Sequence, residues 1–564
     1  MAQRTNSGRL TVKRFFYVLL LLLLCWWLWS VLWPSHRIWH NAHIITMEDQ
    51  NPVATAIAWR RGVITAIGSD QSVLAGKRWY TDVRDLGGQV VMPGFVDAHS
   101  HFPASGIGDI TVDLSSPPLG DVIGLRDLYA RIRTAIESDP SSDDWLVGFN
   151  YDQASLREGL HPTRQALDQL SSSRPVYVYH SSGHMGVANS AALEKLGLSD
   201  DRFKDGLLQE HLAPSLGELI SRFSLLDLMH SYRSAQRDYL ASGLTTVNSG
   251  AGSLALIIGL RAASAIGVLP MRTVVNRLLV GDDTADSLSL SARLKHLNSA
   301  RFEVGAIKLI VDGSPQGFTA FLSRDFVDPP DGSIKGGSNR GSPLLALDML
   351  VDKVSRYAKA GIQLALHGNG DAAIDMILDA VEASGLDAAD DHRTLVVHAQ
   401  TARQDQIDRM AQLGVLPSFF VSHVYYWGDW HAARVVGESR AQHLSPTGWA
   451  RDNELRFSLH SDAPVTPVDP FAILQFSMER KTASGRVLGE EHRLSVHQAL
   501  RAVTIDAAWQ HFLADKVGSL VVGKYADLVV LSDDPYEVGS SEISDIEVLE
   551  TIVHGNIEFS RYEN

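Results

Sequence analysis

Eight short apolar runs, separated mostly by helical patterns, constrain the fold of this chain more than any other feature. Between two of the runs, Leu347, Leu350, Val354 and Tyr357 recur at the spacing of one helix face. Strands that alternate with helices predict a parallel sheet covered by helices, and eight repeats predict an α/β fold of the (β/α)8 TIM-barrel type. The predicted strand regions are residues 91–102, 243–249, 271–276, 304–312, 362–367, 394–398, 415–419 and 455–461.

An open, doubly wound sheet is the alternative fold, because it uses the same alternation of strands and helices. No glycine-rich phosphate loop of the expected pattern follows an early strand, which counts against a nucleotide-binding sheet. The length of 564 residues exceeds that of one ordinary compact domain, so we expect two or three domains.

The sequence patterns outside the eight strand–helix repeats predict further domains. Residues 40–92 and residues 513–564 both contain short strand patterns with turns. A few hairpins cannot bury both of their faces alone, so the two chain ends are predicted to form one small β-sandwich domain. The barrel is placed at residues 93–512. Within it, residues from about 114 to 241 are too many for a loop and predict an inserted subdomain over the barrel mouth.

The N-terminal residues predict a membrane anchor. Residues 15–33 form an uncharged run of 19 residues rich in leucine and tryptophan, enough to cross a hydrocarbon core of roughly 30 Å as a helix. Basic residues in the predicted tail, 1–14, place the N-terminus in the cytoplasm and the catalytic domain outside, in the periplasm or extracellular space. A cleaved signal peptide is the alternative, but no small-x-small cleavage site follows the run.

Charge and cysteine content exclude several function classes. The formal net charge is −15, with acidic residues dispersed along the chain, which favours solubility and predicts no nucleic-acid partner. Cys25 is the single cysteine, so no intrachain disulfide can form. A cysteine nucleophile or a cysteine-based zinc site is therefore not expected.

Polar side chains follow the ends of several predicted strands, where barrel enzymes gather their chemistry. His99 and His101 lie two apart, so both imidazoles can point to one face and bind one divalent metal ion. Chance among 22 histidines, or a polar turn, explains that pair equally well on its own. Together with the later residues they are hard to explain as packing, because each would carry an unpaired polar group into the barrel mouth. These later residues are Lys308, His367, His398 and Asp462.

The motifs around these residues cover nearly all of the chain after residue 33. They are Pro-Gly-Phe-Val-Asp-Ala-His-Ser-His (93–101), Lys-Leu-Ile-Val-Asp-Gly-Ser (308–314), Pro-Gln-Gly (315–317), His-Gly-Asn-Gly-Asp (367–371), His-Ala-Gln (398–400), Ser-Asp-Ala-Pro (461–464) and Gly-Lys-Tyr-Ala-Asp-Leu (523–528). In these motifs the chain resembles the amidohydrolase superfamily and, within it, the amidohydrolase family 3 branch. It is similar in kind to N-substituted formamide deformylase-type metal-dependent hydrolases.

The resemblance implies a metal-dependent hydrolase that cleaves a carbon–nitrogen bond of a non-peptide amide with a metal-activated hydroxide. Family members hold one or two divalent ions, usually zinc, with His99 and His101 matching the ligands of one ion and His367 and His398 those of the other. Lys308, once carboxylated on N6 by CO2, would bridge two ions; an ordinary Lys308 in an ion pair beside a single metal is the alternative. Asp462 is expected to ligate metal and to act as the general base.

Three further residues are predicted to support this centre. Asp97 is expected to orient a ligand histidine rather than to bind metal. His184, in the polar cluster 181–184, and His423, next to the aromatic residues 425–427, are expected to contact the substrate. The alternatives are that His184 caps a turn and that the aromatic residues belong to the core.

The expected partner is a small-molecule amide, together with the membrane through the N-terminal helix, while a homodimer is left open. A lactonase or another ester-cleaving hydrolase is the alternative activity, because the same hydroxide attacks any activated carbonyl. A catalytically silent binding module is a more remote alternative. It would predict broken ligand positions, and all six are present.

Overall fold

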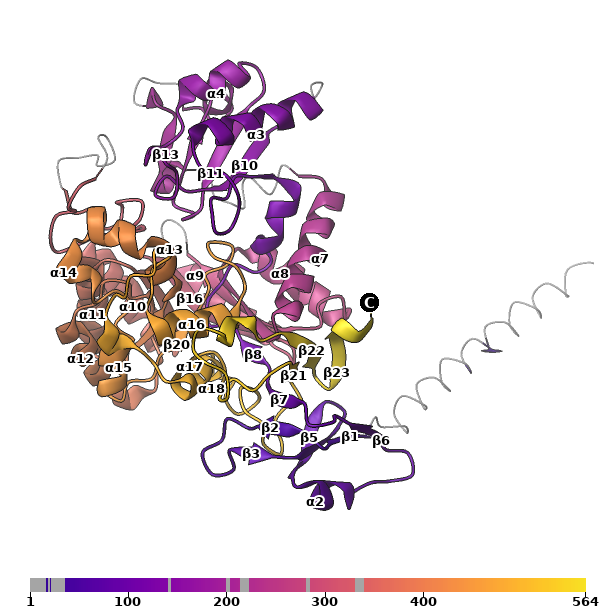
Figure 1. Ribbon diagram of the computed structural model, residues 1–564. Coiled ribbons are helices and arrows are strands. Elements are labelled where there is room, and N and C mark those ends of the chain that lie inside the picture. Colours follow the sequence, from indigo (N-terminus) through magenta and orange to yellow (C-terminus); the bar gives the residue numbers. More distant parts are fainter. Residues whose placement is uncertain are drawn as a thin grey trace, which may run out of the picture.

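The computed structural model describes residues 17–18, 21, 36–139, 144–198, 203–213, 223–279, 285–329 and 339–563. A central sheet surrounded by helices forms the largest part of the molecule (Figure 1). A smaller sheet with α3 and α4 lies above it in this view, and strands β1 to β6 lie below it.

Eight parallel strands form the central sheet, and each lies beside the next one along the chain. They are β8 (Phe95–Val96), β14 (Leu244–Gly252), β15 (Arg272–Leu278), β16 (Phe302–Ile310), β17 (Leu364–Gly368), β18 (Leu395–His398), β19 (Leu416–Phe419) and β20 (Ser458–Leu459). All eight fall on the predicted runs. The sheet is curled, so that the segments after its first and last strands meet: the Asp462 N–H donates to the His99 carbonyl over 3.2 Å, and the His101 N–H to the Ala463 carbonyl over 2.8 Å. This is the architecture of a TIM-like barrel.

The helices between these strands follow the predicted apolar faces, and some of them end at a glycine in the left-handed conformation. Helix α11 buries Ile374, Ile377 and Val381 and ends at Gly385, whose φ is 79°. The helices of the barrel region are α8 (Leu254–Ala265), α9 (Ala285–Leu294), α10 (Leu347–Lys359), α11 (Asp371–Ser384), α12 (Gln404–Leu413), α13 (Ser422–Trp430), α14 (Glu438–Ala441), α15 (Thr447–Asp452), α16 (Pro470–Glu479), α17 (Val496–Ala502) and α18 (Ile505–Gln510).

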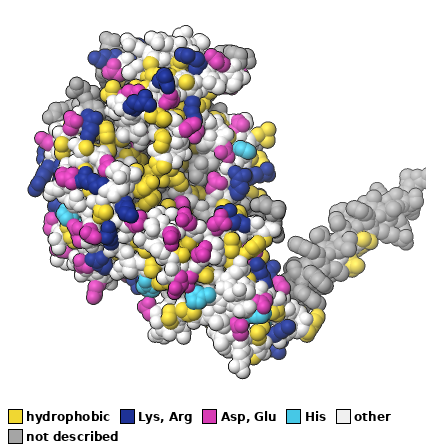
Figure 2. Space-filling view, viewed as in Figure 1, with side chains coloured by type: hydrophobic (Ala, Val, Ile, Leu, Met, Phe, Trp, Pro, Cys, Tyr) yellow, Lys and Arg dark blue, Asp and Glu magenta, His cyan; other side chains and the backbone are white. Residues whose placement is uncertain are grey.

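A second sheet is inserted between β8 and β14. Its order is β13-β12-β11-β10-β9, and it has apolar clusters of its own. Its elements are β9 (Val112–Asp113), α3 (Leu125–Ser138), β10 (Leu146–Tyr151), α4 (Arg164–Leu170), β11 (Val176–His180), β12 (Met185–Ala188), α5 (Ser190–Lys195) and β13 (Leu207–Gln209), after which α7 (Leu225–Ala241) leads back to the barrel. On the face drawn in Figure 2, hydrophobic side chains gather below this inserted unit, with basic and acidic side chains interspersed around them.

The two ends of the chain meet in a third region made of two sheets. One has the order β5-β4-β1-β6 and the other the order β23-β22-β21-β7-β2-β3, and residues of both share one apolar core. Strand β7 pairs with β21, so residues more than 400 positions apart in sequence are neighbours. The strands are β1 (His36–His40), β2 (His43–Ile45), β3 (Val53–Ala54), β4 (Ala56–Arg60), β5 (Val63–Gly68), β6 (Asp82–Asp85), β7 (Val90–Pro93), β21 (Leu528–Leu531), β22 (Val548–Val553) and β23 (Asn556–Ser560). The domain bounds given above stay predictions.

The predicted membrane topology is corrected by the structure. Crossing a hydrocarbon core takes about 20 apolar residues in one helix, whereas α7, the longest helix described, has 17 residues and includes charged ones. Within the described residues, no helix is long and apolar enough to span a membrane. This finding overturns the single-pass topology with an outer catalytic domain. The predicted tail, 1–14, lies outside the described residues, as does the predicted span, 15–33, apart from 17, 18 and 21.

Candidate metal centre

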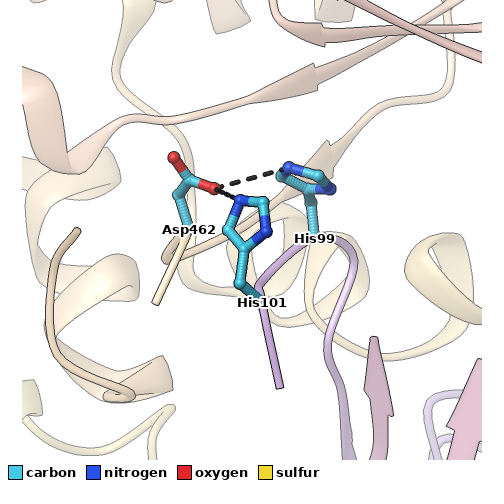
Figure 3. A group of neighbouring side chains, drawn as sticks. All are labelled: His99, His101 and Asp462. Carbon is cyan, nitrogen blue, oxygen red and sulfur yellow. Dashed lines mark ion pairs between the residues drawn. The ribbon is translucent and has the colours of Figure 1, made fainter. Parts of the chain in front are cut away.

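His99, His101 and Asp462 converge at the carboxyl end of the barrel. The histidines follow β8 and the aspartate follows β20, the first and last strands of the sheet. The Nε2 atoms of His99 and His101 lie 3.4 and 3.2 Å from Oδ1 of Asp462 (Figure 3). His99 and Asp462 are buried and His101 is half-buried. Predicted ligands from the two ends of the barrel sequence therefore form one compact group.

This group fits a divalent metal ion. Its ligand atoms all lie within 4.8 Å of one another, and two imidazoles with one carboxylate are a donor set that zinc and similar ions accept. Oδ1 of Asp462 is buried and accepts no hydrogen bond from the described residues. Burial lowers the pKa of His99 well below its ordinary range, so its imidazole is neutral, the form that binds metal.

The backbone is shaped to bring these side chains together. Asp462 has a φ of 54° and His398 a φ of 78°, left-handed values that non-glycine residues adopt mainly where the surroundings require them. Gly250 in β14 lies against the His99 ring, and a Cβ at this position would be 2.1 Å from Cε1 of His99. Glycine is therefore needed here for the ring to reach its place.

Lys308, His367 and His398 extend the group across the barrel mouth. Nζ of Lys308, in β16, is 3.4 Å from Nε2 of His99. The rings of His367 and His398, at the ends of β17 and β18, are 4.7 Å apart, and the His398 ring is 5.5 Å from that of His99. Burial lowers the pKa of Lys308 to about 8. The structure thus brings all six predicted ligands into one continuous cluster.

Comparison with known proteins identifies the family to which this chain belongs. A family model described as "Amidohydrolase family" matches residues 82–559. The chain belongs to the amidohydrolase family. Its similarity supports the predicted family 3 branch.

Relatives and solved structures share almost the whole length of this amidohydrolase. It is 29% identical to N-substituted formamide deformylase of Arthrobacter pascens over 92% of this chain and 98% of that protein. An uncharacterized metal-dependent hydrolase of Pyrococcus horikoshii OT3 superposes with a TM-score of 0.70 at 23% identity, covering 90% of this chain and 99% of that one. A second, from Pyrococcus furiosus, has a TM-score of 0.67 at 25% identity, covering 89% and 100%. The long, nearly complete overlaps show that the fold is shared over almost the whole of the chain.

Asp97 holds the backbone of His99 and does not contact its ring. The carboxylate accepts the His99 N–H over 3.2 Å, the Asn248 N–H over 3.0 Å and the Ser100 hydroxyl. Burial raises the pKa of Asp97 to about 6. The structure therefore places Asp97 against the main chain of His99 in this amidohydrolase, and its role in orienting a ligand histidine stays a prediction.

Asp312, which the sequence analysis did not single out, orients an imidazole directly. Its Oδ1 lies 3.1 Å from Nδ1 of His367. The carboxylate also accepts the N–H groups of Asn369 at 3.0 Å and Gly370 at 2.7 Å. Burial raises the pKa of Asp312 to about 7, and these backbone bonds oppose the increase. Asp312 lies four residues after Lys308, at the end of the same predicted strand. This position could have identified it as a residue of the site.

His460 is a second residue that was missed. Its Nε2 lies 3.1 Å from Nδ1 of His398, and its Nδ1 lies 2.9 Å from Oγ of Ser418. The residue stands two positions before Asp462, the same spacing that drew attention to His99 and His101. Burial lowers the pKa of His460 to about 3, so a neutral imidazole supports His398.

His184 extends from the inserted sheet to the cluster formed by the six predicted ligands, which we call the metal cluster. It lies between β11 and β12, and its ring is 5.1 Å from that of His367. Its Nδ1 is 3.0 Å from Oε2 of Glu210, a residue not predicted, which follows β13. Burial alone would lower the pKa of His184, but Glu210 outweighs it and raises the pKa, while His184 in turn lowers that of Glu210 against the effect of burial. The two side chains form a half-buried ion pair at the mouth.

His423 lies behind the metal cluster, at the start of α13. Its ring packs on Phe420, with 4.7 Å between centroids, and Phe420 in turn stacks on His460. Nδ1 of His423 is 3.0 Å from Nε2 of His431. Its neighbour Tyr425 stacks on Phe476 at 4.4 Å, so the core alternative describes that aromatic residue well.

Proposed function

We propose that this amidohydrolase hydrolyses the carbon–nitrogen bond of a non-peptide amide. The observation that carries the proposal is the convergence of two imidazoles and one carboxylate from opposite edges of the sheet on one point in the barrel mouth. The proposed cofactor is one or two zinc ions. The proposed ligands are His99, His101, Lys308, His367, His398 and Asp462.

A divalent ion bound here supplies Lewis acidity, which activates water and polarises a carbonyl oxygen. Asp462 is the proposed general base. Burial would raise its pKa, but the neighbouring His101 and Lys308 outweigh burial and lower it, so the carboxylate is ionised at neutral pH. It can accept a proton from the attacking water and pass it to the nitrogen of the leaving amine.

Lys308 is proposed to carry a carboxyl group on Nζ. An ammonium cannot ligate a cation, whereas the product of amine and CO2 is an anion with two oxygens, formed with release of a proton. Only the neutral amine forms the new N–C bond, and burial favours the neutral amine by lowering the pKa of Lys308 to about 8. Mass analysis of the native protein should show the added CO2, and its absence together with one metal per chain would favour an unmodified Lys308.

The substrate class is proposed to be small amides such as N-substituted formamides. Similarity to the deformylase of Arthrobacter pascens supports this choice. His184, whose pKa Glu210 raises and whose ring lies beside that of His367, is the proposed hydrogen-bond donor to substrate. His423 is proposed to act on the pocket wall through Phe420 and not as a direct proton donor, because its Nδ1 already faces His431.

The test is a substrate screen on protein of known metal content. Formamides, N-acyl amino acids and lactones are offered to zinc-loaded protein, to chelator-treated protein and to the Asp462→Asn variant. We expect metal-dependent amide turnover that the variant loses. Turnover of lactones alone would replace the proposal by an esterase activity, and amide turnover that survives chelation would refute it.

A further inference from the structure

A second group of potential metal ligands lies outside the barrel mouth. His443 follows α14, while Glu491 and His492 belong to the short 3-10 helix η7 (Glu490–His492). Nδ1 of His443 is 3.2 Å from Oε1 of Glu491 and 3.1 Å from Nε2 of His492, and the distance from Nε2 of His492 to Oε1 of Glu491 is 3.7 Å. Three ligand atoms from two distant chain segments thus form a small triangle.

The size of this triangle matches one face of a tetrahedral zinc site. Zinc binds nitrogen and oxygen at about 2.0–2.2 Å, which places the ligands of a tetrahedron about 3.3–3.6 Å apart. All three distances lie within a few tenths of an ångström of that span. A single N–H on Nδ1 of His443 can be donated to Glu491 or to Nε2 of His492 but not fully to both, whereas one cation would satisfy all three ligand atoms at once.

The triangle is held in place by its surroundings. The Trp449 ring of α15 stacks on His443 at 4.7 Å and meets the His492 ring edge-on at 4.9 Å. His492 is fully buried, and burial lowers its pKa to about 3, so its imidazole is neutral. A Cβ at Gly448 would lie 2.3 Å from the Glu491 carbonyl oxygen, so glycine is required for α15 to approach η7 this closely.

Further contacts fix the backbone of η7. The Thr447 hydroxyl donates to the His492 carbonyl at 2.5 Å, and Arg451 donates to the Glu491 carbonyl at 3.3 Å. The outer side of the group is open, since the side chains of His443 and Glu491 are 40% and 52% exposed. An ion can therefore enter from solvent, and solvent can complete its coordination.

We propose that His443, Glu491 and His492 bind one zinc ion at a site separate from the barrel mouth. The ion would join the segment after α14 to η7, which are about 50 positions apart in sequence. The segment after α14 contacts the metal cluster indirectly, because the Ser445 N–H donates to the Gln400 carbonyl at 2.9 Å and Gln400 follows His398 by two residues. The zinc ion bound by His443, Glu491 and His492 would stabilise, from outside the barrel, the segment that follows His398.

Zinc stoichiometry tests the proposal. The full chain is freed of metal, equilibrated with zinc and analysed by mass spectrometry for bound ions per chain. We expect the wild-type protein to bind one ion more than His443→Ala. His497→Ala is the matched control, because His497 contacts the Tyr536 hydroxyl at 2.8 Å and no described carboxylate or second imidazole. Equal zinc content in the wild-type protein and His443→Ala would overturn the proposal.

A second variant separates loss of the ion from loss of the fold. Glu491→Gln keeps the shape of a half-exposed side chain and removes the anionic ligand. Without zinc, its melting temperature should equal that of the wild-type protein. With zinc, the wild-type melting temperature should rise more than that of the variant. An equal rise in both proteins would contradict a metal-ligand role for Glu491, whatever the activity of the barrel site.

Discussion

The strand ends of the barrel and the inserted sheet both place histidines at the mouth, but they place them differently. His99, His101 and Asp462 stand on segments joined by backbone hydrogen bonds across the first and last strands. His184 and Glu210 stand on connections of a separate sheet, and they meet the metal cluster where the His184 ring lies beside that of His367. Under the proposed function, the barrel strand ends would carry out the reaction and the inserted sheet would select the substrate.

Packing explains why the two parts can differ. The inserted sheet has its own apolar clusters, which include Phe149, Tyr177 and Val178, whereas the metal ligands stand on strands that share the main core of the barrel. A change in the insertion can therefore alter contacts to substrate without moving the ligand atoms. Four variants test this division, in order of decreasing expected effect.

The Asp462→Asn variant should lose the most. We expect kcat to fall by about 10³-fold, because an amide cannot take up the proton that a general base must accept. Bound metal, counted by mass spectrometry, should remain. Asp469→Asn is the control, since Asp469 caps α16 and asparagine caps helices equally well. Wild-type turnover in Asp462→Asn would remove this residue from the mechanism.

The Asp312→Asn variant should weaken the metal site by about 10- to 100-fold in affinity or activity, the usual cost of losing a carboxylate that orients a ligand histidine. Asp97→Asn is the comparison, because the Asp97 carboxylate accepts the backbone N–H of His99, whereas the Asp312 carboxylate contacts the imidazole of His367. We expect Asp97→Asn to lower the melting temperature but to change zinc affinity less. Equal losses of zinc affinity in the two variants would show that Asp312 does not support metal binding by orienting the His367 ring.

The His184→Ala variant should lower kcat/KM by roughly tenfold, mainly through KM, because a hydrogen bond from a charged donor contributes about 1.5 kcal/mol at the lower end of its usual range. Zinc content should be unchanged. The control is His230→Ala, since His230 is 69% exposed on α7. If His184→Ala instead lost metal, the inserted sheet would belong to the reaction part of the site and the division would fail.

The Glu210→Gln variant should show the smallest effect, seen as a pH-dependent difference in melting temperature from the wild-type protein. The raised pKa of His184 stabilises the fold below the ordinary value of 6.5, and this is lost as pH rises through the folded pKa. The lowered pKa of Glu210 stabilises the fold above the ordinary value of 4.5, and this is lost as pH falls through the folded pKa. The difference should therefore be largest between these values, and a difference independent of pH would contradict the ion pair.

Sequence reasoning located the ends of the barrel strands, but it missed the residues that contact the histidines at those ends. The eight runs correspond to the eight strands, and the six predicted ligands lie near one another, because a strand places its last residues at one edge of the sheet, so that chain order gives spatial order. Their metal-binding role stays a prediction. Asp312 and His460 were missed because what marks them is a partner: His367 for one and His398 for the other. Neither distance can be obtained from spacing along the chain.

The sequence by itself determined the barrel, the family and the residue types that gather at its mouth, because apolar periodicity and strand-end motifs are local properties of the chain. Only the tertiary structure decided which groups touch. It paired Glu210 with His184, placed Asp97 on the backbone of His99, and set His443 beside His492 at 3.1 Å. These contacts depend on how separate segments pack, and packing is a property of the whole folded chain.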